Sequence, residues 1–141
     1  MTIADRKYTC SVGIGERVSG IAICANDNFS ARYDLDRIRG VFSRPAHSLY
    51  GQSYVDKILV LNTAKGGVAT SWMLYDMVSR KMAPRALVLN STNPILAQGA
   101  AFANLALVHE FSVDVTSEIQ TGEFITVDPS EGWVLVHVEK S

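Results

Sequence analysis

The sequence predicts an α/β fold in which a short parallel βαβαβ core is wrapped by strands from both ends of the chain. Three observations lead to this prediction. Short apolar runs rich in β-branched residues are bounded by Gly, Pro, Asn or Asp, as strands commonly are. Two helical segments alternate with the three middle runs, a pattern that produces a parallel sheet through right-handed crossovers. The other runs stand at the two ends of the chain and must surround this core.

The expected strands are short. They cover residues 9–14, 20–24, 58–62, 86–90, 105–108, 124–127 and 134–138. Residues 128–132, Asp-Pro-Ser-Glu-Gly, are typical of a turn and should join the last two strands as a hairpin.

The first expected helix covers residues 69–81 and ends before Pro84, because proline cannot continue a helix. Its apolar side chains have an approximately helical period: Trp72, Leu74, Tyr75 and Val78. We expect Tyr75 to pack in the core and Asp76 to face solvent.

The second expected helix begins at Pro94, which suits a first helical turn, with Thr92 or Asn93 as its cap. It continues through Ala103 with almost no polar face. We therefore expect it to be buried on most sides.

Composition limits the classes of function. We expect 141 residues to form a single domain, residues 1–141. The 13 basic and 14 acidic residues give no basic excess, which argues against nucleic-acid binding. The N-terminus is charged before any apolar run, and residues 95–108 are shorter than the roughly 18–20 apolar residues of a membrane span. We expect a cytoplasmic protein that binds no membrane, and its 48% apolar content favours a surface covered by a partner.

One loop has a composition suited to chemistry. Residues 63–71, Thr-Ala-Lys-Gly-Gly-Val-Ala-Thr-Ser, lie between an expected strand and an expected helix. Gly66 and Gly67 would let backbone amides approach a ligand, and Lys65 adds a positive charge. Thr70 and Ser71 place hydroxyls in the first helical turn. The order Lys-Gly-Gly excludes a P-loop, which needs Lys directly after Gly. The loop is either a carboxylate-binding, serine-activating site or an ordinary turn with hydroxyl caps.

Three motifs around this loop resemble the swivel domain of aconitase X. They are HSLYGQS at 47–53, KILVLNTAKGGVATSWMLYDM at 57–77 and MAPRALVLNSTNPILAQGAAFANLALV at 82–108. The resemblance implies a swivelling β/β/α-type domain that forms the small subunit of a hydro-lyase (dehydratase). It also implies a large aconitase X subunit as partner and an iron–sulfur cluster as cofactor.

The resemblance further implies roles for the loop residues. Ser71 would be the base that removes a proton, while Lys65, Gly66, Gly67 and Thr70 would bind the substrate carboxylate. Many relatives carry Ser where this chain has Gly67, which leaves open which hydroxyl acts. We expect no metal ligand in this chain and place the cluster on the partner, because iron–sulfur clusters need about three or four thiolates and only two cysteines are present.

The resemblance also implies a small hydroxylated carboxylate as the substrate. The few basic residues near the loop favour cis-3-hydroxy-L-proline, which would be converted to pyrroline-2-carboxylate. The alternatives are the small subunit of a phosphomevalonate dehydratase, a non-catalytic swivel-type interaction module, and a carboxylate-binding domain without a large partner. We expect His47 to form structural hydrogen bonds and Asn93 to cap a helix.

Overall fold

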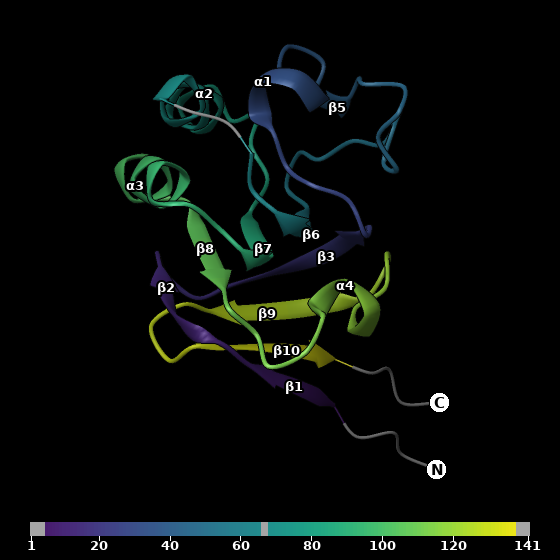
Figure 1. The fold of residues 1–141 in the computed structure, drawn as a ribbon, viewed down its shortest axis with the longest axis vertical. Coiled ribbons are helices and arrows are strands. Elements are labelled where there is room, and N and C mark those ends of the chain that lie inside the picture. The colour runs from purple at the N-terminus through teal and green to yellow at the C-terminus, as the bar shows by residue number, and fades with distance from the viewer. Residues whose placement is uncertain (1–4, 66–67, 138–141) are drawn as a thin grey trace.

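The structure, a computed structural model that describes residues 5–65 and 68–137, has two strand layers and one helical layer (Figure 1). Eight strands form one continuous sheet in the order β1-β10-β9-β3-β6-β7-β8-β2. These strands are β1 (Arg6–Thr9), β2 (Ser11–Ile14), β3 (Val18–Cys24), β6 (Ile58–Thr63), β7 (Ala86–Ser91), β8 (Ala106–His109), β9 (Phe124–Asp128) and β10 (Trp133–His137).

The middle of the sheet is parallel. β3, β6, β7 and β8 run side by side in the same direction, with Val60 paired to Val88 between β6 and β7. The first four residues of β6 and of β7 are all buried. Continuous apolar runs are what a parallel strand needs, because other layers cover both of its faces. The predicted parallel βαβαβ core is confirmed.

The terminal strands form the second layer. β1, β10 and β9 are antiparallel, and β3 joins the two layers: Val18–Ile21 pairs with β9, while Ala22–Cys24 pairs with β6. β1 and β2 follow one another in the chain but lie at opposite ends of the sheet order, so the sheet curls around an apolar core. The N- and C-terminal strands therefore wrap the parallel core, as predicted.

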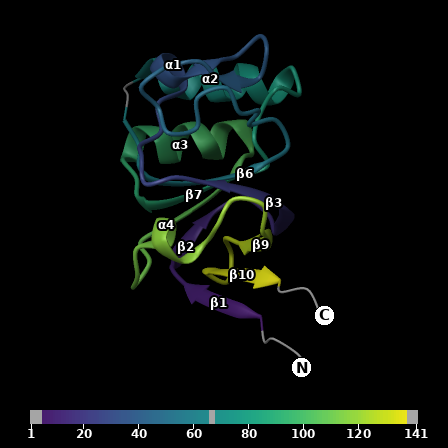
Figure 2. The same ribbon diagram turned by 90° about the vertical axis from the view of Figure 1, so that its right-hand side faces the viewer.

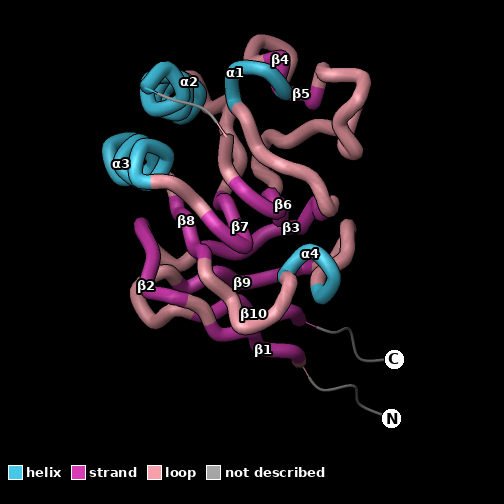
Figure 3. The backbone as a smooth tube through the Cα atoms, in the orientation of Figure 1, coloured by secondary structure: helices cyan, strands magenta, loops and turns pink. Residues whose placement is uncertain are grey.

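The two long helices cover the other face of the parallel strands. α2 (Val68–Ser79) and α3 (Pro94–Ala103) lie next to each other on one side of the molecule (Figures 2 and 3). Asn93 caps α3 by accepting a hydrogen bond from the Leu96 amide at 2.8 Å, and Pro94 occupies the first turn. The helix ends at Asn104, whose φ of 57° is left-handed. The predicted role of Asn93 is confirmed.

The predicted burial of these helices is wrong on one face. α3 was expected to be buried on most sides, yet 65% of the Phe102 surface is exposed. Trp72 and Tyr75 of α2 are also exposed, while Leu74 and Met77 of the same helix form the core. The apolar positions of α2 and α3 cover more of each helix than the sheet can bury. The excess faces outward.

Short elements occupy segments without a clear period. They are α1 (Ala31–Asp34), the small hairpin of β4 (Leu35–Asp36) and β5 (Val41–Phe42), and α4 (Val115–Glu118). None of the four was predicted. In the part of the chain that the structure describes, no helix has both the length and the apolar character that spanning a membrane requires.

Candidate functional site

The carboxyl ends of the parallel strands form a polar edge. The hydroxyl of Ser91, at the end of β7, donates to that of Thr63, at the end of β6, at 2.8 Å. One residue earlier on each strand, Asn90 Nδ2 donates to Asn62 Oδ1 at 3.1 Å. Ligands of open α/β sheets bind beyond this edge, where the loops leave the strands. The loop that the sequence analysis singled out leaves from here.

Lys65 lies at this edge and is exposed. Its backbone amide donates to the carbonyl of Phe29 at 2.8 Å, and Phe29 also forms a parallel bridge with Ala64. These contacts place the segment after β3 directly beside the start of the loop. Gly66 and Gly67 lie outside the described residues, so the expected role of their amides stays a prediction.

The two predicted hydroxyls differ in accessibility. Thr70 is buried, with 2% of its surface exposed, and its expected contact with substrate stays a prediction. Ser71 is partly exposed and lines a groove of about 330 Å³ between α2 and α3, together with Ile95 and Gly99. Its hydroxyl donates to the carbonyl of Ile95 at 3.0 Å. Ser71 is therefore accessible from this groove and is also tied to the neighbouring helix.

Aromatic side chains continue the groove across the outer face of the helices. The ring centroids of Trp72 and Phe102 are 6.3 Å apart, and those of Tyr75 and Phe102 are 5.1 Å apart. We call Trp72, Tyr75, Ile95 and Phe102 the aromatic face. Each of these side chains is exposed. Contiguous exposed apolar surface of this kind commonly marks an interaction site.

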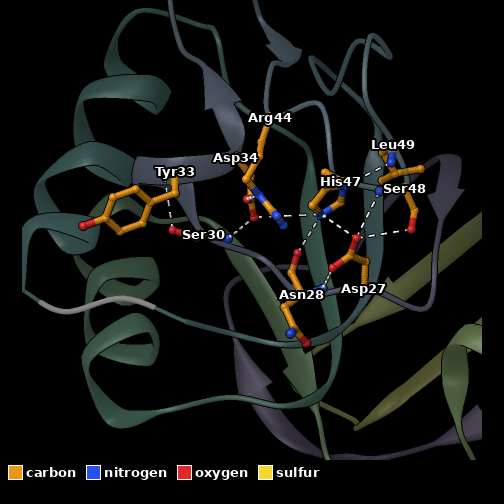
Figure 4. A network of polar contacts seen from close by, with 9 residues as sticks. All are labelled: Asp27, Asn28, Ser30, Tyr33, Asp34, Arg44, His47, Ser48 and Leu49. Atoms are coloured by element: carbon orange, nitrogen blue, oxygen red, sulfur yellow. Dashed lines mark hydrogen bonds and ion pairs between the residues drawn. The ribbon is translucent and has the colours of Figure 1, made fainter.

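A buried histidine, His47, bonds to the segment that follows β3 (Figure 4). His47 Nε2 lies 2.8 Å from the carbonyl of Asn28, and its Nδ1 accepts a hydrogen bond from the Leu49 amide at 3.0 Å. Both ring nitrogens therefore have a main-chain partner. The ring Nε2 also lies 3.9 Å from Asp27 Oδ2 and 3.9 Å from Asp34 Oδ2. The expected structural role of His47 is confirmed.

Two carboxylates lie on either side of this ring. Burial raises the pKa of the Asp27 carboxyl, but hydrogen bonds from the Ser48 and Asn28 amides lower it by more, so the pKa lies below its usual value. Asp34 is deeper, with 4% of its side chain exposed. Its Oδ1 accepts from Arg44 Nε at 2.6 Å, and its Oδ2 accepts from the Ser30 amide at 2.9 Å.

Sequence reasoning missed this cluster. Asp34 and Arg44 lie in a segment without helical or strand periodicity, and ten residues separate them. The available signal was the Arg-Pro-Ala-His run that precedes the Leu-Tyr-Gly turn. It places a cation and a titratable ring close together in the sequence, but it does not indicate that Arg44 lines a pocket with Lys65.

The described residues do not fit an iron–sulfur cluster. Burial raises the pKa of the Cys10 and Cys24 thiols to about 11, and these two cysteines are fewer than the three or four thiolates that a cluster commonly needs. Over residues 5–65 and 68–137, no group of three or more His, Cys, Asp or Glu side chains could hold a metal ion.

Known proteins give independent comparisons. The sequence profile of the aconitase X swivel domain matches residues 7–136. The chain is 29% identical to the phosphomevalonate dehydratase small subunit of Methanococcoides burtonii, over 95% of this chain and 96% of that protein. It is 31% identical to that of Thermococcus sibiricus, over 86% and 92%. The crystal structure of holo-form Thermococcus kodakaraensis aconitase X superimposes with a TM-score of 0.87 and 26% identity, over 94% of this chain and 99% of that one.

The matched residues extend from β1 into β10, and the superposition reproduces the layers described above. Two of the three motifs that carried the resemblance contain the strands of the polar edge and the two long helices: β6 with α2, and β7 with α3. The chain therefore belongs to the aconitase X swivel-domain family.

Proposed function

We propose that this chain is the small subunit of a dehydratase whose substrate is a phosphorylated hydroxy acid, phosphomevalonate. The observation that carries this proposal is the alignment over almost the whole length of small subunits with that name. The few basic residues near the loop favoured cis-3-hydroxy-L-proline, with phosphomevalonate as the alternative. The named relatives support the alternative, and the hydroxyproline substrate stays a prediction without such support.

In this proposal Ser71 removes the proton and Lys65 binds an anionic group of the substrate. Dehydration takes a proton from one carbon and a hydroxide from its neighbour, which leaves a carbon–carbon double bond and water. The bond from Ser71 to the Ile95 carbonyl stabilises the protonated hydroxyl, since a hydrogen bond donated by the neutral form disfavours its ionisation. Ser71 can act as the base only after this bond is released.

We assign the iron–sulfur cluster and the site that accepts the hydroxide to the large subunit. The exposed aromatic face is the surface that we expect this subunit to cover, because it continues from the groove that contains Ser71. A subunit that binds here would also enclose the proposed base and exclude water from it.

Reconstitution tests the proposal. The chain is co-expressed with its large subunit, and dehydration is measured with phosphomevalonate and with cis-3-hydroxy-L-proline. Turnover of phosphomevalonate alone is the expected result. Turnover of hydroxyproline alone would restore the first prediction. A complex that forms and turns over neither compound would favour the interaction module.

A variant of the aromatic face tests where the partner binds. Phe102→Ser should weaken association of the two subunits by at least about tenfold, because central aromatic anchors carry much of the binding energy of an interface. Phe124→Ser is the matched control, since Phe124 is also exposed but lies on β9, away from α2 and α3. Equal effects of the two substitutions would place the interface elsewhere.

A further inference from the structure

A second pocket borders the loop at Lys65. It has a volume of about 350 Å³ and is lined by Asn28, Ser30, Tyr33, Asp34, Arg44 and Lys65. Lys65 belongs to both the loop and the pocket. Its backbone amide donates to the carbonyl of Phe29, which stands in the chain between the lining residues Asn28 and Ser30. The pocket therefore lies where the loop leaves the polar edge, and it brings a second cation to Lys65.

Arg44 is oriented rather than free to rotate. Its Nε donates to Asp34 Oδ1, and the main chain is fixed as well, since the Ser43 amide donates to the carbonyl of Asp34 at 2.8 Å. Asp34 in turn is held through Oδ2 by the Ser30 amide. In Figure 4 the two charged side chains face each other within this network. The buried carboxylate of Asp34 accepts from the Ser30 amide with one oxygen and from Arg44 Nε with the other, and so it fixes the plane of the guanidinium.

The remaining donors of Arg44 are available. Within the part of the chain that the structure describes, its hydrogen bond and its ion pair both involve Nε, and neither Nη group has a protein partner. About 40% of its side chain is exposed. Two adjacent N–H donors in a fixed plane match two oxygens of one oxyanion. Asp34 weakens the attraction by its own charge, but its side chain is only 4% exposed.

We propose that Arg44 and Lys65 together bind the phosphate monoester of the substrate in this pocket. The inference rests on the proposed function and adds the group that recognises the substrate class. A phosphate monoester carries about −1.5 to −2 charges at pH 7 and offers three acceptor oxygens. Two cations, one presented as a planar fork, suit it better than they suit a single carboxylate. A hydroxyproline-type substrate has no group for this pocket.

Arg44→Lys in the complex of both subunits tests the proposal. The substitution keeps the charge and removes the planar fork. We expect KM for phosphomevalonate to rise about tenfold with little change in kcat, because lost uniform binding affects KM alone. Arg39→Lys is the matched control: Arg39 also pairs with an aspartate, Asp36, but is 80% exposed and lines no part of the pocket.

A binding measurement makes the proposal independent of turnover. Methyl phosphate and acetate are titrated into the complex as probes of a phosphate monoester and of a carboxylate. We expect Arg44→Lys to weaken binding of methyl phosphate about tenfold and to leave acetate binding unchanged. An unchanged affinity for methyl phosphate, equal to that of Arg39→Lys, would overturn the proposal. A complex that binds methyl phosphate through Arg44 but does not dehydrate phosphomevalonate would refute only the proposed function.

Discussion

Ser71→Ala separates a catalytic role of Ser71 from a structural one, because the structure predicts almost no change in stability. The substitution removes the hydrogen bond to the Ile95 carbonyl. That carbonyl lies in the first turn of α3 and also faces the helical amide four residues later, so it is not left unpaired. A neutral hydrogen bond contributes about 1 kcal/mol net, and alanine is favoured over serine in a helix by roughly 0.5 kcal/mol. The unfolding free energy should change by no more than about 0.5 kcal/mol.

The expected change in rate is far larger. A base that transfers the proton in the transition state contributes about 10²- to 10⁴-fold. This factor corresponds to about 3–5 kcal/mol of barrier. The assay is kcat of the reconstituted complex with saturating phosphomevalonate, measured beside thermal unfolding of the same preparation. Ser79→Ala is the matched control, because Ser79 lies on the same helix and its hydroxyl likewise donates to a main-chain carbonyl, that of Asp76, at 2.9 Å.

One outcome refutes the assignment directly. If Ser71→Ala keeps kcat within about threefold of the Ser79→Ala value, Ser71 is not the base and its hydroxyl only joins the two helices. A large loss of kcat at unchanged unfolding temperature supports the base. If both kcat and the unfolding temperature fall strongly, the stability estimate is wrong. The hydrogen bond between the helices then contributes more to the unfolding free energy than the roughly 1 kcal/mol of a neutral hydrogen bond.

Two further substitutions test the supports of the site. In Gly99→Ala the new Cβ would lie 2.7 Å from Ser71 Cα and 2.9 Å from its Oγ. The resulting overpacking should cost about 1–3 kcal/mol, which outweighs a helix-propensity gain of about 1 kcal/mol. The unfolding temperature and kcat should therefore both fall. Hydrogen bonds from the side chains of Thr116 and Asn90 hold the pKa of the Asp114 carboxyl below its usual 3.8. The ionised carboxyl therefore stabilises the folded protein above pH 3.8, and this contribution disappears as the pH falls through the lower pKa of the folded state. Asp114→Ala should therefore cost about 1–2 kcal/mol in denaturant unfolding at neutral pH, and this difference should shrink in acid; an equal cost at both pH values would contradict the charged cap.

The fold could be predicted where local signals and tertiary packing agree. The apolar runs of β6 and β7 are buried on both faces, and Asn93 with Pro94 begins α3 where capping chemistry requires. The face of α2 could not be predicted, because Trp72 and Tyr75 are as apolar as the core residues between them. Their exposure depends on how much of the helix the sheet covers, which no local period records.

The candidate site divides in the same way. Lys65 and Ser71 could be found because a glycine loop between a strand and a helix indicates a binding edge before any contact is known. Arg44 could not, because its position depends on a carboxylate ten residues earlier and on the pairing of Phe29 with Ala64. The count of basic residues near the loop in the sequence therefore underestimated the positive charge at the site. That undercount also favoured the substrate without a phosphate.

Asp34→Asn tests whether Arg44 depends on its carboxylate for orientation. Asp34 accepts through two oxygens, Oδ1 from Arg44 Nε and Oδ2 from the Ser30 amide, whereas an asparagine accepts only through Oδ1 and would turn its Nδ2 donor toward one of these donors, which then loses its partner. Hydrogen bonds to charged groups contribute about 1.5–3 kcal/mol, and thermal unfolding should shift down accordingly. The guanidinium also loses its fixed plane, so KM for phosphomevalonate should rise as it does in Arg44→Lys. The reasoning fails if Asp34→Asn lowers stability while KM stays unchanged, because Arg44 would then bind the phosphate without its carboxylate or not bind it at all.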